Sequence, residues 1–155
     1  MTKRTFASRF PSAAESPGFL LWKAATAHHR RQRRALAELG ISPTQFSLLA
    51  SFFFLSQTHG RPVSQAELAE HAALDKMLVS DGTRALLGKK LIVRRRSESD
   101  ARAFAIELTE RGVTVCNRAL RVVEEADAAF FARTGDVPAF ARLLTTLLTP
   151  ATGTD

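Results

Sequence analysis

The fold is decided by residues 64–90, which read SQAELAEHAALDKMLVSDGTRALLGKK. Ser64 followed three residues later by Glu67 is a capping-box pattern, which predicts the start of a short helix. A second helix is expected from near Asp75 to about Lys89, so only a short turn separates the two. Two helices joined in this way are typical of a helix-turn-helix unit.

The apolar positions of this stretch support the pairing of the two helices. Leu68, Ala72, Leu74 and Val79 fall where they would face a shared core, and small Ala69 lies where the second helix must pass close to the first. We therefore expect the two helices to pack directly on each other.

A basic hairpin is predicted immediately after these helices. Residues 91–93 and 104–108 are rich in strand-forming residues, and the segment between them is polar. The hairpin carries four arginines: Arg94, Arg95, Arg96 and Arg102. A basic hairpin next to a helix-turn-helix unit is typical of a wing, which reaches phosphates or the minor groove of DNA. Paired helices and runs of arginine are each common, so the prediction depends on finding the two together.

Further helices are expected on both sides of this unit, over about 17–39, 42–57, 110–133 and 136–148. The longest carries an apolar stripe that Asp127 interrupts; its members are Val113, Cys116, Leu120, Val123 and Phe130. Such a stripe needs a partner, which is the first helix, the last helix or a second subunit. The predicted fold class is mainly α with a small β-hairpin wing.

Composition limits the remaining possibilities. A chain of 155 residues is expected to form one domain, with a loose arm at 1–16 and a tail at 150–155. The formal net charge of +7 favours a polyanionic partner. No apolar run approaches the roughly 18–20 residues of a membrane span, so we expect a cytoplasmic protein without membrane contact.

The chain lacks the usual signs of an enzyme or a metal site. No nucleophile elbow, phosphate loop or carboxylate pair is present, so we expect no catalysis and no cofactor. The four histidines show no metal-ligand spacing, and the single cysteine excludes a Cys-rich zinc site. Cys116 lies on the apolar stripe, where inert packing is favoured over redox chemistry.

Candidate DNA-contacting residues follow from groove chemistry. The exposed early positions of the second helix would face base edges, and they are Lys76, Met77, Ser80, Asp81 and Arg84. Arg84 is suited to guanine or phosphate, whereas Asp81 would repel phosphate unless it binds cytosine or pairs with an arginine. Ser64 and Gln65 are placed to hold a phosphate at a helix N-terminus.

The chain resembles the multiple antibiotic resistance regulator (MarR) family over about residues 17–149. The matching stretches are GISPTQF at 40–46, SQAELAE at 64–70, LDKMLVS at 74–80, LIVRRR at 91–96, DAR at 100–102 and LTERG at 108–112. The resemblance implies a homodimer formed by helices in 17–40 and 109–149, with a winged helix-turn-helix lobe at 41–108. It also implies repression through a pseudo-palindromic double-stranded DNA site, relieved by a small aromatic or phenolic molecule or by an oxidant.

Three positions depart from the family's usual pattern. Ala101 stands where a wing arginine is usual, although Asp100 remains to brace the wing and Arg102 to supply a cation. Lys90 stands where a glycine usually ends the second helix, so either it adopts an unusual backbone conformation or the helix ends differently. Gly82 replaces an apolar residue within that helix, which should cost about 1 kcal/mol and loosen the packing of the helix.

The resemblance places an effector pocket between the dimer helices and the winged lobe. Its candidate lining residues are Trp22, His28 and Phe46, although the sequence favours the ordinary core for each of them. Two alternatives to a ligand-responsive repressor remain open. The first is a winged-helix interaction module without operator binding, which is suggested by four residues: Asp81, Gly82, Lys90 and Ala101. The second is an RNA-binding winged helix.

Overall fold

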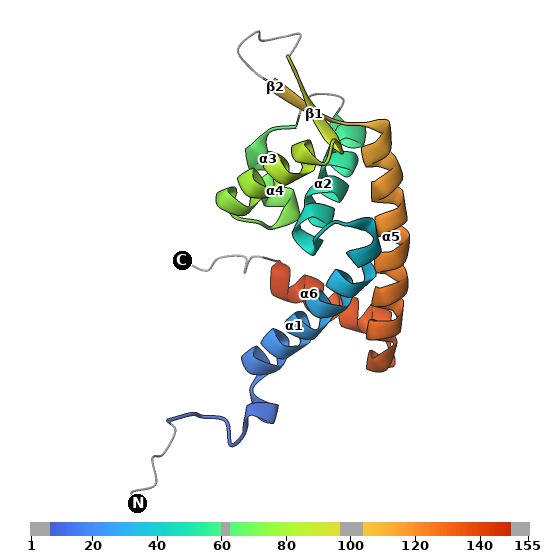
Figure 1. Ribbon diagram of the computed structural model, residues 1–155. Coiled ribbons are helices and arrows are strands. Elements are labelled where there is room, and N and C mark those ends of the chain that lie inside the picture. The colour runs from blue at the N-terminus through green and yellow to red at the C-terminus, as the bar shows by residue number, and fades with distance from the viewer. Residues whose placement is uncertain (1–6, 60–62, 97–103, 150–155) are drawn as a thin grey trace, which may run out of the picture.

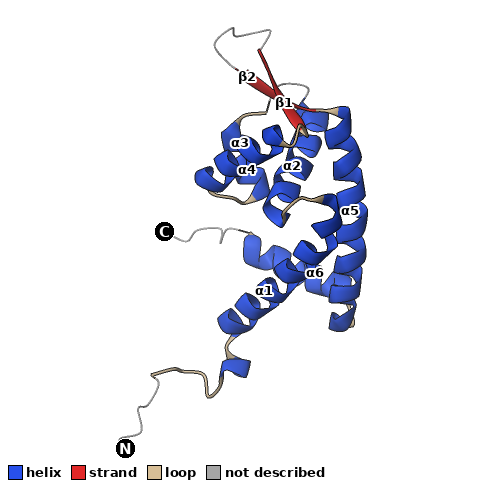
Figure 2. Cartoon of the chain, in the orientation of Figure 1, coloured by secondary structure: helices blue, strands red, loops and turns tan. Residues whose placement is uncertain are grey.

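The computed structural model describes residues 7–59, 63–96 and 104–149 of the chain (Figure 1). Its helices and strands are, in order, α1 (Pro17–Ala35), α2 (Pro43–His59), α3 (Gln65–Ala72), α4 (Lys76–Gly88), β1 (Ile92–Arg96), β2 (Phe104–Leu108), α5 (Glu110–Phe131) and α6 (Val137–Leu148). Short 3₁₀ turns are η1 (Ala13–Glu15), η2 (Ala37–Leu39) and η3 (Ala132–Thr134). Figure 2 shows helices throughout and one hairpin, which confirms the predicted fold class.

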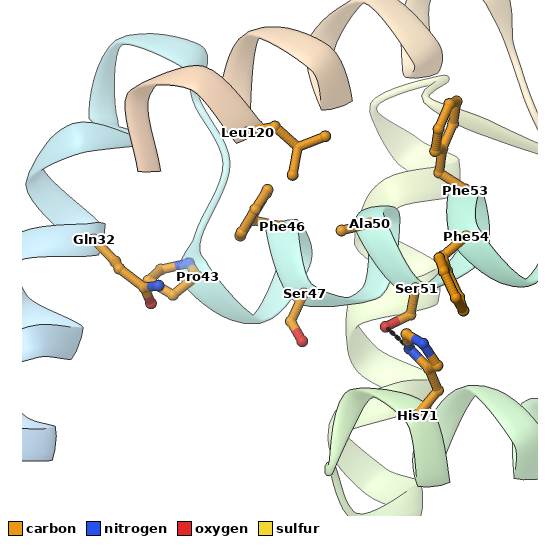
Figure 3. A pocket seen from close by; sticks show the side chains of 10 residues that line it. All are labelled: Gln32, Pro43, Phe46, Ser47, Ala50, Ser51, Phe53, Phe54, His71 and Leu120. Carbon is orange, nitrogen blue, oxygen red and sulfur yellow. Dashed lines mark hydrogen bonds between the residues drawn. The ribbon is translucent and has the colours of Figure 1, made fainter. Parts of the chain in front are cut away.

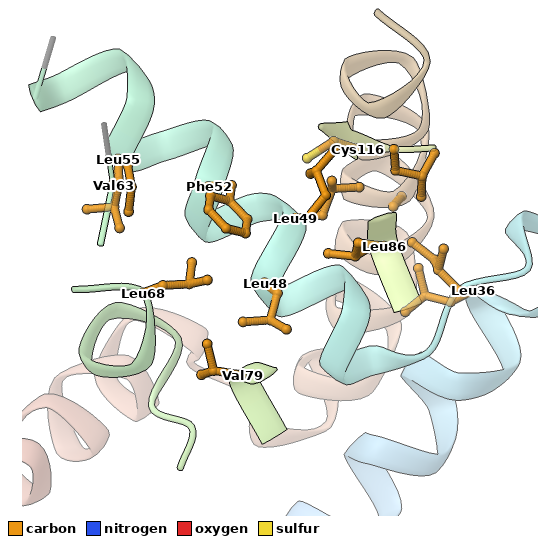
Figure 4. Packing of buried hydrophobic residues seen from close by; sticks show 14 of the residues in the cluster. Leu36, Leu48, Leu49, Phe52, Leu55, Val63, Leu68, Val79, Leu86 and Cys116 are labelled. Atoms are coloured by element: carbon orange, nitrogen blue, oxygen red, sulfur yellow. The ribbon is translucent and has the colours of Figure 1, made fainter. Parts of the chain in front are cut away.

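A winged lobe is built around α2. Leu48, Leu49 and Phe52 of α2 are almost completely buried, because α3 and α4 cover one side of this helix and α5 the other (Figure 4). Leu68 of α3 and Val79 of α4 lie in the same core, as their spacing predicts. Helix α2 is therefore the central element of the lobe, although Phe54 and the residues of its last turn remain exposed.

The hairpin projects from one end of this lobe (Figure 1). Its strands pair antiparallel, from Ile92 opposite Leu108 to Arg96 opposite Phe104. Ile92 is buried, whereas Arg94 is exposed two residues further on. The base of the hairpin is therefore anchored in the core, and its basic part extends away from it.

Helix α5 connects the lobe to the terminal helices. Its first half packs on the lobe through Cys116 and Ala119, and α1 packs beside it towards its C-terminal end (Figure 1). The predicted apolar stripe is correct for Cys116 and Val123, which are buried, while Phe130 is half-buried beside α1. Among the described helices, none qualifies as a membrane span by its length and hydropathy.

Two departures from the family pattern have clear structural consequences. Lys90 adopts the left-handed conformation, with φ of 58°, which is the first of the two alternatives that the sequence left open. Gly82 is buried where α4 packs on α2, and a Cβ atom added there would lie 2.2 Å from Leu48 Cδ1. The expectation that Gly82 loosens the packing is wrong, because its missing side chain is what permits this close approach.

One helix is shorter than the sequence suggests. The first helix was expected to continue to Leu39, but α1 ends at Ala35 and a 3₁₀ turn follows. Gly40 ends that turn in the left-handed conformation, with φ of 64°. A glycine adopts this conformation without steric cost, which allows the chain to enter α2.

Candidate nucleic-acid interface

Helix α4 presents one polar, exposed face to solvent. Lys76, Met77, Asp81 and Arg84 are exposed and Ser80 is half-buried. The opposite face packs into the lobe, and its members are Val79, Gly82, Thr83 and Leu86. The helical period places the predicted base-reading residues on a single face, which is largely exposed to solvent.

The helix begins at a well-defined cap. The Asp75 side chain accepts a hydrogen bond from the Leu78 backbone N–H at 2.8 Å. Ala73, in the left-handed conformation with φ of 52°, turns the chain from α3 into this cap. The Leu74 N–H donates to the Ala69 carbonyl at 3.0 Å, so the turn is held to α3 by its own backbone.

The start of α3 lies next to the start of α4. Ser64 caps α3 by accepting a hydrogen bond from the Glu67 N–H at 3.2 Å, and a Glu67 oxygen accepts one from the Ser64 N–H at 2.9 Å. Gln65 and Lys76 together line a recess of about 210 Å³ between the two helices. The structure thus brings a helix N-terminus, an amide and a cation together, which suits a phosphate oxygen.

Asp81 is paired with an arginine on its own helix. The Arg84 Nη1 donates to Asp81 Oδ1 at 2.9 Å, and both side chains are largely exposed. Pairing with an arginine is one of the two expected ways in which Asp81 avoids repelling phosphate; the other is binding to cytosine. Such an exposed pair contributes at most about 1 kcal/mol, so Arg84 remains available to a stronger anionic partner.

The wing is described in part. Arg94 is exposed on β1, and Arg95 and Arg96 continue the same strand, for which the backbone alone is described. Asp100 and Arg102 lie outside the described residues. The structure therefore places one predicted wing cation at the surface of the hairpin.

A basic residue close to this surface has a different role. Lys89, the residue after α4, donates its Nζ to the Gly40 carbonyl and to Gln45 Oε1, the latter at 2.9 Å. It joins the end of α4 to the turn that precedes α2. Sequence reasoning missed this contact, because nothing in the local pattern relates positions 49 residues apart.

A cavity of about 630 Å³ lies between the winged lobe and α1 and α5 (Figure 3). Its lining residues are Gln32, Pro43, Phe46, Ser47, Ala50, Ser51, Phe53, Phe54, His71 and Leu120. Three phenylalanines supply an aromatic wall, and the polar groups gather at Gln32, Ser47 and the Ser51–His71 pair. Size and lining are those of a small-molecule site.

The structure brings only one of the three predicted effector residues to this cavity. Phe46 lines it. Trp22 instead lies near the exposed start of α1, where its ring stacks on Phe19 with centroids 5.9 Å apart. His28 Nε2 lies 2.8 Å from Asp127 Oδ1 and packs against Phe130, on the side of α1 that faces α5.

The remaining reactive side chains form no further site in the described part of the chain. No group of three His, Cys, Asp or Glu residues there could hold a metal ion. Cys116 is fully buried, and burial raises the pKa of its thiol. A neutral buried thiol is a poor nucleophile, which favours the packing role.

Several known proteins are similar to this chain in sequence and architecture. The MarR family model matches residues 41–104. The HTH-type transcriptional regulator YdcH of Bacillus subtilis is 39% identical over 125 residues, which cover 81% of this chain and 84% of YdcH. The HTH-type transcriptional repressor Rv2887 of Mycobacterium tuberculosis is 34% identical over 116 residues, covering 75% of this chain and 80% of that protein.

Solved structures agree with these relatives. The structure of Rv2887 in complex with salicylic acid is 32% identical, with a TM-score of 0.67, and the match covers 88% of this chain and 99% of that one. An Escherichia coli MarR mutant solved with operator DNA has a TM-score of 0.73 at 20% identity, covering 85% and 93% of the two chains. At that identity the second match concerns the fold alone.

Proposed function

The chain belongs to the MarR family of transcriptional regulators, and from this membership we propose that it is a homodimeric repressor whose affinity for double-stranded DNA is lowered by a small aromatic effector. Helix α4 enters the major groove, and the hairpin wing contacts the adjacent backbone or minor groove. The two lobes of the dimer bind the two halves of a pseudo-palindromic operator.

The polar face of α4 is the observation that carries the DNA-binding part of this proposal. Met77 is 70% exposed although it is apolar, and Lys76 and Arg84 flank it on the same face. In this exposed position the Met77 side chain can contact a thymine methyl group in the major groove, while the flanking cations bind phosphate or guanine.

The terminal helices support the homodimer. Helix α1 contains no buried residue, and at its start Phe19 through Trp22 are 42–63% exposed. Helix α6 also contains none, and its Leu143, Leu147 and Leu148 are 65–83% exposed. Two long helices that leave this much apolar surface uncovered need a partner, and a second copy offers a matching surface of the same kind.

The cavity beside α2 is the proposed effector site. It has room for a single aromatic ring with substituents, and its phenylalanines offer stacking partners. The relative Rv2887 has been solved with salicylic acid, so we infer that a compound of this size and chemistry occupies the corresponding cavity here.

A charge reversal tests the DNA-binding proposal. Arg94→Glu leaves the core untouched, because Arg94 is exposed on β1. We expect the variant to remain a dimer in analytical ultracentrifugation and to lose most of its affinity for duplex DNA, since each phosphate contact contributes to binding. Unchanged duplex binding would contradict the proposed role of the wing.

The same experiment separates the alternatives. An intact dimer of the unmodified protein that binds no duplex at low salt would favour an interaction module. Preference for RNA in a competition assay would favour the RNA-binding interpretation. The pairing of Asp81 with Arg84 and the tight seat of Gly82 against α2 both favour a working DNA-reading helix over a degenerate one.

A further inference from the structure

His71 links the cavity to the DNA-reading helices. The other described lining residues lie on α1, α2 and α5, whereas His71 lies in the last turn of α3. Two residues later the chain passes through the left-handed Ala73 and its turn into α4. Because Leu74 is hydrogen-bonded back to α3, a displacement of His71 carries the start of α4 with it.

Two contacts hold His71 against α2. Its Nδ1 lies 2.9 Å from Ser51 Oγ, and its ring stacks on Phe54 with centroids 5.0 Å apart and planes inclined by 27°. Ser51 is 4% exposed, and its hydroxyl points across the cavity wall towards the histidine, as the dashed line in Figure 3 shows. The bond thus joins α2 to the end of α3 in the wall of the proposed effector cavity.

We propose, building on the function inferred above, that the hydrogen bond between His71 and Ser51 is the element through which a small phenolic ligand lowers DNA affinity. The ligand's ring stacks beside Phe46 or Phe54, and its hydroxyl bonds with Ser51 or His71 in place of their bond to each other. Freed from α2, the end of α3 shifts, and α4 no longer holds the position that matches the major groove.

Such a switch has a thermodynamic requirement. A ligand shifts an equilibrium between two conformations only if it binds them with different affinities. The proposed mechanism meets this condition, because Ser51 and His71 are bonded to each other in the DNA-binding conformation that it assumes and are free for the ligand in the other. The two lining serines provide a direct comparison, because Ser47 and Ser51 both lie on α2 and both face the cavity, but Ser51 alone of the two bonds to His71.

The test measures coupling between salicylate and operator DNA in the full-length dimer. Four proteins are compared: the unmodified protein, Ser51→Ala, His71→Phe, which keeps a ring to stack on Phe54, and Ser47→Ala. Calorimetry gives the salicylate affinity with and without operator, and fluorescence anisotropy gives the operator affinity with and without saturating salicylate. By linkage the two ratios must agree for each protein.

We expect the unmodified protein to show coupling in the usual range of roughly 5–150-fold. In Ser51→Ala and His71→Phe, salicylate should change the operator affinity by less than about a tenth of the change that it causes in the unmodified protein. The ligand-free operator affinity of both variants should fall towards that of the unmodified protein with salicylate bound. Ser47→Ala should bind salicylate more weakly but keep the full coupling at saturation. Thermal unfolding of each variant checks that it folds; His71 is an exposed position, so His71→Phe tests the proposal even if Ser51→Ala does not fold.

The outcomes distinguish this inference from the function it builds on. Full coupling in Ser51→Ala and His71→Phe would overturn the role of the hydrogen bond and leave the ligand-responsive repressor intact. An unmodified protein that binds its operator with the same affinity in saturating salicylate would overturn this inference and the effector part of the proposed function. Failure to bind any operator would overturn the proposed function itself.

Discussion

A single methyl group at the junction of α5 and the wing should destabilise the whole lobe. Gly112 lies in the first turn of α5, and a Cβ added there would meet the Leu91 carbonyl oxygen at 1.9 Å and its carbon at 2.9 Å. Carbon–oxygen contacts lie at about 3.3 Å or more, so in Gly112→Ala the helix and the residue preceding β1 must separate by roughly 1.4 Å. The obstacle is backbone, so a change of side-chain rotamer gives no relief.

The structure sets the size of this effect. The Thr109 backbone N–H donates a hydrogen bond to the Leu91 carbonyl at 3.1 Å, and the Thr109 hydroxyl donates one to the Lys90 carbonyl at 2.9 Å. Losing both bonds costs about 2 kcal/mol, and overpacking around the buried Leu91 adds about 1–3 kcal/mol. Alanine returns about 1 kcal/mol through its helix propensity. We expect a net loss of about 2–4 kcal/mol, which lowers Tm by roughly 5–15 °C.

Thermal and urea unfolding at matched protein concentration measure this loss, since the melting temperature of a dimer depends on concentration. Gly88→Ala is the matched control, because a Cβ at Gly88 has no neighbour within 4 Å and the residue lies in the last turn of α4. It should leave stability unchanged or raise it by up to about 1 kcal/mol. If Gly112→Ala proved as stable as Gly88→Ala, the close packing of α5 on the wing would be refuted.

Three further substitutions have distinct expected results. Asp81→Asn releases Arg84 from its carboxylate partner and should raise duplex affinity roughly 3–10-fold in anisotropy, with a salt slope steeper by up to about 0.9; unchanged affinity would count against a DNA contact by either residue. Ser64→Ala removes the cap of α3 and should cost about 1 kcal/mol in urea unfolding. Burial raises the pKa of the Cys116 thiol, so the unfolded chain loses this proton first as pH rises. The thiol's contribution to stability is therefore full below about pH 8.5 and declines as pH rises through the folded pKa. Cys116→Ala should lack this decline, and identical pH profiles from pH 7 to 10 would contradict it.

Local signals predicted the DNA-reading unit closely. The capping box at Ser64, the helix start near Asp75 and the two runs of strand-forming residues each depend on neighbours a few residues apart, and the structure confirms the elements that they predict. The face of α4 follows from the helical period in the same way. Such features need no knowledge of the tertiary fold.

Other features depend on elements distant in sequence, and local patterns do not reveal them. Gly82 appears in the sequence as a helix-weakening residue, yet its environment is Leu48 of another helix. The family resemblance placed Trp22 and His28 at the effector pocket, but neither of them lines the cavity beside α2. The bond between His71 and Ser51 spans 20 residues and two helices, so no local pattern indicates it.

Whether this protein is a sequence-specific repressor is tested by its binding to the DNA that flanks its own gene. Fluorescence anisotropy of the full chain across a salt series, with excess nonspecific competitor, would measure this binding. We expect tight binding that survives the competitor, with log affinity falling by roughly 0.9 per neutralised phosphate against log salt. Footprinting of the bound fragment should show two half-sites about 10 base pairs apart or a multiple of that spacing. Binding that the competitor abolishes on every flanking fragment would contradict this function.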